Sequence, residues 1–206
     1  MAPLVAVSFA LVACSRSLYD FPDINPSLKA NQVNLIVDSS FEDPSVQFCV
    51  SNCRTSSGWS VEHTTALPPK YEQTKNGAVA GTYAEAFSYV GQPGDDGVGK
   101  SIELYNVAVG PTTKGGYRLT FTLWVSGTCV KCAPIIGIEA FDKGNHYLGE
   151  TDQYFDPPET PRAVQVSYDL PKGTVIAASF LQVPEIYSVS SVNLFVDNAS
   201  LVSTAR

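Results

Sequence analysis

Apolar and polar residues alternate along several segments of this chain, a period typical of β-strands with one buried face. The clearest case is Tyr117–Ser126, where every second residue is apolar. The predicted inward positions are Tyr117, Leu119, Phe121, Leu123 and Val125. The intervening positions are polar except for Trp124, so this strand is predicted to bury one face and to expose the other.

Five other segments are predicted strands, and helical periodicity is almost absent. They are Ala78–Val90, Ser101–Val107, Ile135–Phe141, Ala163–Leu170 and Val175–Val183. Turn sequences rich in glycine separate them, such as Lys114-Gly115-Gly116 and Pro171-Lys172-Gly173. The segment Phe155–Pro161 is predicted to be a loop, because three prolines remove backbone donors. Strands at this spacing indicate an all-β fold, an antiparallel sandwich or barrel.

Composition narrows the class of protein. The 206 residues suffice for one domain with a substantial core, and no internal repeat divides them. The formal net charge of -7 argues against a nucleic-acid partner, because such proteins carry basic patches. Only 16% of the residues are charged, which is low for a cytosolic protein.

The N-terminal region predicts export. Residues 2–13 form an apolar run that is too short to span a bilayer and fits a signal peptide. Leu11-Val12-Ala13-Cys14 also resembles the lipobox of bacterial lipoproteins, so lipid attachment at Cys14 is an alternative to plain cleavage. We expect a leader at 1–14, a polar tether at 15–32 and one domain at 33–203. The mature chain is then secreted or on the cell surface, with no membrane-spanning segment.

The other four cysteines fall in two close pairs, Cys49/Cys53 and Cys129/Cys132. In an exported protein, an even set of closely spaced cysteines indicates disulfides. Pairing within each pair and pairing between them are both compatible with the spacing. A four-thiolate zinc site is the metal-binding alternative, since C-x3-C and C-x2-C are near ligand spacing. We expect two disulfides among these residues, because export favours oxidation.

Acidic residues lie beside apolar strands at both ends of the predicted domain. Asn34–Glu42 and Asn193–Leu201 each combine a core-like run with carboxylates, which is costly unless something pairs with them. If the first and last strands lie close together, Glu42 and Asp197 can share one cation.

The order of several motifs resembles the galactose-binding-like β-sandwiches, especially carbohydrate-binding modules. The opening Asn34-Leu35 with Phe41-Glu42 and the closing Val196-Asp197-Asn198 are similar to the two ends of such modules. Gly58-Trp59, Tyr117–Gly127 and Ile138–Gly144 are similar to their internal motifs. The similarity covers roughly residues 34–201. It implies a jelly-roll fold, a structural calcium ion held by Glu42 and Asp197, and a carbohydrate ligand.

Sugar sites combine aromatic platforms with planar polar groups. Trp124 and Arg118 share the predicted outer face of their strand, and Glu103 and Tyr105 lie opposite Ile102 and Leu104. We expect Trp124, Tyr105, Glu103 and Arg118 to form a carbohydrate-binding face on one sheet. The alternative for Trp124 is structural packing under a loop. Trp59 is expected in the core, since it follows Gly58 at the start of a short apolar strand.

Signatures of catalysis are missing from the sequence. It has two histidines, no Gly-x-Ser-x-Gly elbow, no H-E-x-x-H and no phosphate loop. Acids that meet only in the fold, among Glu139, Asp142 and Glu150, are the catalytic alternative. We therefore expect a non-catalytic, calcium-stabilised module that binds carbohydrate. The rival hypothesis is a structural or adhesive β-sandwich of a cell surface, filament or particle that binds protein.

Overall fold

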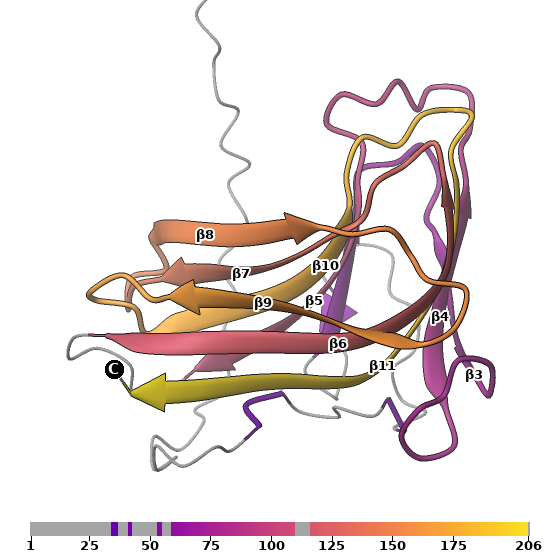
Figure 1. Ribbon diagram of the computed structural model, residues 1–206. Helices are drawn as coiled ribbons and strands as arrows, with labels where there is room; N and C mark the ends of the chain where they lie inside the picture. Colours follow the sequence, from indigo (N-terminus) through magenta and orange to yellow (C-terminus); the bar gives the residue numbers. More distant parts are fainter. Residues whose placement is uncertain (1–33, 37–40, 43–52, 55–58, 110–115, 206) are drawn as a thin grey trace, which may run out of the picture.

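The computed structural model describes residues 34–36, 41–42, 53–54, 59–109 and 116–205. These residues form eleven strands and no helix, arranged in two antiparallel sheets (Figure 1). The six-stranded sheet has the order β1 (Cys53–Arg54), β2 (Trp59–His63), β5 (Ile102–Val109), β10 (Ile176–Val183), β7 (Ile135–Phe141) and β8 (Tyr147–Tyr154). The five-stranded sheet has the order β3 (Lys70–Thr74), β4 (Ala84–Val90), β11 (Ser191–Ala205), β6 (Tyr117–Val130) and β9 (Arg162–Asp169). The prediction of an all-β antiparallel sandwich is confirmed.

Strand β6 follows the predicted alternation. Leu119, Phe121, Leu123 and Val125 are buried between the sheets, whereas Tyr117 is half-buried. Trp124 lies on the other face of the strand and is also half-buried. Phe155–Pro161 contributes only Phe155 to the periphery of the core and forms no strand, as expected for its proline content.

The core fills the space between the two inner faces. Trp59, at the start of β2, is fully buried there, and its ring stacks on that of Phe41 with centroids 4.8 Å apart. The prediction that Trp59 belongs to the core is confirmed. The described part of the chain contains no helix long and apolar enough to cross a membrane.

The opening segment of the domain lies beside the last strand. Asn34 bridges to Val202, and the amide of Leu35 donates to the carbonyl oxygen of Leu201 at 2.9 Å. The side chain of Asn34 donates from Nδ2 to the carbonyl of Ala199 and accepts from the amide of Leu201. The expected proximity of the two ends of the domain is therefore confirmed.

The predicted strand Ala78–Val90 is too long, because β4 begins only at Ala84. Residues 75–83 instead form a loop over the outer face of the five-stranded sheet. A Cβ added at Gly77 would lie 2.6 Å from the Cβ of Phe195, so the loop backbone rests on that side chain. Backbone amides of this loop bind carboxylates rather than a neighbouring strand, which explains why the strand pattern fails here.

Candidate functional site

The outer face of the six-stranded sheet carries polar and aromatic side chains in register. Glu103 of β5 lies between Glu62 of β2 and Gln182 of β10, so three planar polar groups form one row across the sheet. The next row places Tyr105 beside Phe180. Since residues in register on adjacent strands share a face, these two rows form one continuous surface.

Hydrogen bonds fix the groups of this surface. The Tyr105 hydroxyl donates to Glu62 Oε1 at 3.1 Å, and Gln182 Nε2 donates to Glu103 Oε2 at 3.3 Å. Tyr105 also packs with Ile135 and Phe180 in a small apolar cluster separate from the main core. The surface thus combines an apolar floor with oriented carboxylate and amide groups.

Acidic residues are concentrated on the same face, which we call the acidic face: Glu62, Glu103, Glu139, Glu150 and Asp152. Glu62 is opposite Glu103, and Glu139 is opposite Glu150. Like charges directly across two strands cost free energy unless other groups offset the charge. Functional surfaces are where such costs are usually retained.

Strand β8 forms the exposed edge of the acidic face. Tyr154, opposite Ile135, exposes 64% of its surface, whereas Glu103 and Tyr105 each expose only 4%. Burial and the negative charge of Glu150 raise the pKa of Tyr147 to about 12. Burial and Glu150 also raise the pKa of Tyr168, on the adjoining β9. Both phenols therefore stay neutral hydrogen-bond donors at neutral pH.

The expectation of a single face for the four predicted sugar-binding residues is wrong. Glu103 and Tyr105 lie on β5, in the six-stranded sheet, whereas Arg118 and Trp124 lie on β6, in the five-stranded sheet. The outer faces of a sandwich point away from each other, so the two pairs occupy opposite surfaces. The expectation that Tyr105 is exposed is also wrong, because its ring is buried by Ile135 and Phe180.

The outer face around Arg118 is a ladder of paired polar groups. Arg118 Nε donates to Asp169 Oδ1 at 2.9 Å, in an exposed ion pair. Further along, Thr120 is hydrogen-bonded to Ser167, and Gln165 donates to Thr122. Trp124 follows, opposite Ala163 on β9 and Asp197 on β11. Arg118 is thus already engaged with a carboxylate, which makes it a weak candidate for ligand contact.

The loop at residues 75–83 brings Glu42 and Asp197 to one segment of backbone. Asp197 is fully buried, and its Oδ2 accepts from the amides of Val79 and of Ala80, the latter at 2.7 Å. Its Oδ1 accepts from the amide of Asn198 at 2.6 Å. Glu42 Oε1 accepts from the amides of Thr82 and Tyr83 at 2.7 and 2.8 Å.

These contacts test how well the two acids fit a calcium ion. Calcium needs six to eight oxygen ligands, and amide N–H groups cannot supply them. Each carboxylate still has further lone pairs, so Glu42 and Asp197 suit part of a shell that backbone carbonyls would complete. Within the described residues, no group of three or more His, Cys, Asp or Glu side chains could hold a metal. The amide contacts also provide a metal-free reason for the burial of Asp197.

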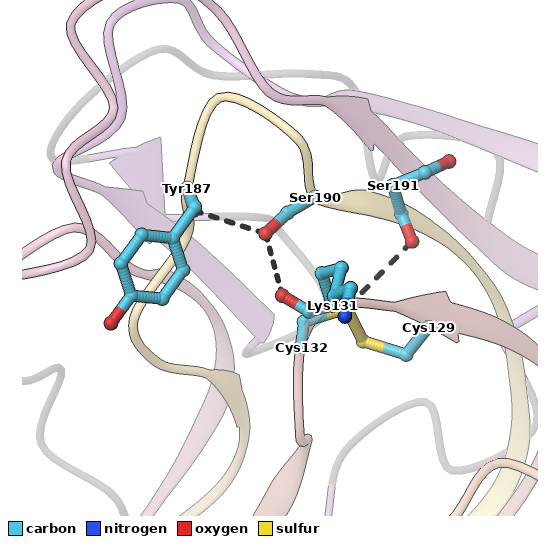
Figure 2. The surroundings of a disulfide bond; sticks show 6 residues. All are labelled: Cys129, Lys131, Cys132, Tyr187, Ser190 and Ser191. Atoms are coloured by element: carbon cyan, nitrogen blue, oxygen red, sulfur yellow. Dashed lines mark hydrogen bonds between the residues drawn. A yellow bond between two sulfur atoms is a disulfide. The ribbon is translucent and has the colours of Figure 1, made fainter.

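One of the expected disulfides is present, between Cys129 and Cys132. This local pairing rules out bonding between the two cysteine pairs and a four-thiolate zinc site. Cys49 lies outside the described residues and only the backbone of Cys53 is described, so their disulfide stays a prediction. Figure 2 shows that Ser190 links the disulfide turn to a neighbouring loop. Its hydroxyl donates to the carbonyl of Lys131 at 2.7 Å and accepts from the amide of Tyr187 at 3.0 Å.

A buried carboxylate, Asp95, ties together loops at one end of the sandwich. It accepts from the Tyr89 hydroxyl at 2.6 Å and from the amides of Gln92 and Ala66, both at 2.8 Å. Burial alone would raise the pKa of Asp95, but these hydrogen bonds outweigh it and lower the pKa from 3.8. Burial and the bond to Asp95 raise the pKa of Tyr89. No motif in the sequence points to Asp95, which lies in the turn-like segment Gly94-Asp95-Asp96-Gly97.

Replacing Asp95 by asparagine is expected to lower the free energy of unfolding at pH 7 by about 2 kcal/mol, since hydrogen bonds to a charged group are lost. The pKa of Asp95 is lower in the folded state than in the unfolded state. The stabilisation is therefore present at pH values above the unfolded pKa of about 3.9, and it is lost as the pH falls through the folded-state pKa. Urea denaturation of both proteins between pH 7 and pH 2.5 measures the difference. Asp96→Asn, at an exposed neighbour, is the control, and a difference that stays constant with pH would contradict the assignment.

Comparisons with known proteins identify the fold. No protein-family model matches the sequence, and no curated protein sequence matches it. Among solved structures, the enzymatically active domain of bacteriophage CBA120 tailspike protein 4 shares 12% identity at a TM-score of 0.61. The match covers 82% of this chain but only 21% of the tailspike chain.

Two smaller proteins match over almost their whole length. The CBM22-1 xylan-binding domain of Paenibacillus barcinonensis Xyn10C shares 10% identity at a TM-score of 0.53, over 87% of this chain and 99% of that one. The Stig cyclase Fisc of Fischerella sp. TAU shares 14% identity at a TM-score of 0.58, over 85% and 99% of the two chains. Most of the matching structures are carbohydrate-binding modules. The chain therefore has the β-sandwich fold of carbohydrate-binding modules, as its motifs indicated.

Proposed function

We propose that the protein is a non-catalytic carbohydrate-binding module that holds an oligosaccharide or polysaccharide on the acidic face of the six-stranded sheet. The observation that carries the proposal is the row of Glu62, Glu103 and Gln182 beside the apolar floor of Tyr105 and Phe180. Sugars present hydroxyl groups and flat C–H faces. The accessible partners on this face are the half-buried Glu62 and Gln182 and the exposed Tyr154, whereas Glu103, Tyr105 and Phe180 are buried and support the face from within. The shared fold with carbohydrate-binding modules supports the same conclusion.

The charge of the acidic face favours a neutral glycan. An anionic polysaccharide would bring like charges against the accessible carboxylates of Glu62, Glu150 and Asp152, whereas sugar hydroxyls can donate to them. Trp124, on the opposite surface, is the alternative platform. It is half-buried, and the loop at residues 75–83 lies beside its neighbour Asp197.

Binding of neutral polysaccharides to purified variants distinguishes the two surfaces. We expect Gln182→Ala to weaken binding tenfold or more, because anchors at the centre of a site typically contribute above 1 kcal/mol. Gln165→Ala is the matched control, since it removes an exposed amide on the other sheet. Affinity electrophoresis measures the change, and melting curves confirm folding.

The outcomes separate the hypotheses cleanly. Loss of binding in Trp124→Ala with normal binding in Gln182→Ala would move the site to the five-stranded sheet. Absence of binding to every neutral glycan of an array would reject carbohydrate recognition.

The proposal of a non-catalytic role rests on the sequence, which lacks the motifs of the common hydrolases. Fold alone does not decide this point, because a Stig cyclase shares the sandwich and one fold hosts many functions. We also propose export to the cell surface or beyond, on the basis of the apolar residues 2–13. The Cys129–Cys132 disulfide is consistent with an oxidising compartment.

Calcium is proposed as a structural ion held in part by Glu42 and Asp197. A calcium ion there would neutralise two carboxylates that the loop at residues 75–83 brings to the same backbone segment. Its contribution would be to join the opening segment to the last strand. The amides that already contact both acids position their oxygens whether or not a metal is bound.

A protein-binding role is the second candidate, and exposed apolar side chains at one end of the sandwich favour it. Four exposed apolar residues lie on or beside the loops that Ser190 and Asp95 connect: Val98, Val189, Val130 and Tyr187. Val98 exposes 85% of its surface. Exposed apolar residues on loops held by hydrogen bonds are common in interaction surfaces. Retention of glycan binding after these residues are made polar would separate this role from the first.

A further inference from the structure

A cavity of about 300 Å³ opens at the end of the five-stranded sheet where β3 and β4 lie. Its lining includes Leu67 and Pro68 from the loop before β3, and Lys70, Ser88 and Val90 from the sheet. Lys70 and Ser88 are partners in register and face outward, because their neighbours Tyr71 and Phe87 are buried in the core. The cavity is therefore separate from the acidic face, which lies on the other sheet.

The walls of the cavity are apolar and accessible. Leu67 exposes 53% of its surface and Val90 exposes 64%, although both are aliphatic. A cavity of about 150 Å³ is large enough to hold benzene, so this one has room for a substituted six-membered ring. Two exposed aliphatic side chains and the hydroxyl of Ser88 in the same lining suit a ring that has one C–H face and one polar edge.

One end of the cavity is positively charged. Lys70 is exposed and makes no ion pair with any carboxylate among the described residues. Glu72 lies two residues further along the same face of β3, but no ion pair joins it to Lys70. The ammonium group is therefore available to an anion, whereas the acidic face would repel one.

The cavity is held in shape before any ligand arrives. Asp95 accepts from the amide of Ala66, immediately before Leu67, and from the amide of Gln92, another lining residue. The Thr65 hydroxyl donates to the carbonyl of Leu67 at 2.8 Å, and Gln92 Nε2 donates to the carbonyl of Val90 at 2.6 Å. A wall fixed by four hydrogen bonds loses little conformational entropy on binding.

We propose that this cavity is a second binding site, which takes a six-membered ring bearing a carboxylate. The ring packs between Leu67 and Val90, and the carboxylate pairs with Lys70. Two sources offer this chemistry: a uronic acid residue of a glycan, and a small apolar carboxylic acid. The site is independent of the acidic face, so failure of one proposal leaves the other intact.

The test is an NMR titration of the ¹⁵N-labelled protein with three compounds. Methyl glucuronoside and cyclohexanecarboxylate carry the ring and the charge, and methyl glucoside carries the ring without the charge. We expect both carboxylates to shift the amide signals of Leu67, Lys70, Ser88 and Val90. The stronger of the two identifies the source. Lys70→Gln is expected to weaken binding about fivefold, as for an exposed ion pair worth up to about 1 kcal/mol.

Lys172→Gln is the matched control. Lys172 is also an exposed lysine, but it lies in the turn after β9 and does not line the cavity. Equal loss of binding in Lys172→Gln would show non-specific attraction and overturn the proposal. Binding of methyl glucoside as strong as that of the glucuronoside would overturn it too. Absence of shifts at the lining residues for all three compounds would have the same meaning.

Discussion

Replacement of Trp59 by alanine is expected to lower the free energy of unfolding by about 3–5 kcal/mol. Trp59 is fully buried, and its ring stacks on Phe41. Its strand, β2, pairs with β5, the strand that carries Glu103 and Tyr105. The cavity left by the missing ring would therefore loosen the contact between the opening segment and the six-stranded sheet.

Urea denaturation followed by circular dichroism measures this effect. Fluorescence is unsuitable, because the chain has only two tryptophans and the substitution removes one of them. Trp124→Ala is the matched control, since its half-buried side chain lies outside the core and a smaller loss is expected. A loss below about 1 kcal/mol for Trp59→Ala would contradict the packing described for this residue.

Replacement of Asp197 by alanine is expected to cost about 3 kcal/mol or more. The change leaves the amides of Val79, Ala80 and Asn198 without their acceptor, and each buried unsatisfied donor costs roughly 1–3 kcal/mol. Asp197→Asn is expected to cost less, because a carbonyl oxygen in the place of Oδ2 still accepts from the amides of Val79 and Ala80. Thermal unfolding of the three proteins in chelator gives the order directly, and an unchanged stability of Asp197→Ala would contradict the assignment.

The same variants test the calcium proposal. A ligand that binds only the folded state stabilises it by about 2.7 kcal/mol at a hundredfold excess over its dissociation constant. Calcium is therefore expected to raise the melting temperature of the metal-stripped wild type, and to have no effect on Asp197→Ala. Identical melting curves with calcium and with chelator would reject the ion and leave the amide contacts as the sole partners of the buried carboxylate.

Alternation predicted the interior of the fold well. In β6 the inward residues Leu119, Phe121, Leu123 and Val125 are buried, because one face of a pleated strand must meet the core. Strand β8 escaped prediction, since Tyr147–Tyr154 is an edge strand with mostly exposed side chains and no apolar period. The true start of β4 was missed because Glu42 and Asp197 bind the amides of the preceding loop, and both acids are distant in sequence.

The candidate site was predictable only within single strands. The alternation of side chains along β5 correctly placed Glu103 and Tyr105 on the face opposite the core residues Ile102 and Leu104. It said nothing about the order of strands, and β5 proved to lie between β2 and β10 rather than in the sheet of β6. The shared row of Glu62, Glu103 and Gln182 joins residues from three separate segments, so only the register of the sheet reveals it.

The position of β11 has a consequence for how the chain folds during synthesis. β11 is the last strand, yet it lies between β4 and β6 in the middle of the five-stranded sheet. The five-stranded sheet cannot be completed until residues 191–205 have left the ribosome. Until then, the edges of β4 and β6 that pair with β11 stay without a partner strand. Folding that depends on such distant pairing is slow and exposes aggregation-prone strands. A nascent chain of this protein should therefore rely on chaperones until its final strand emerges.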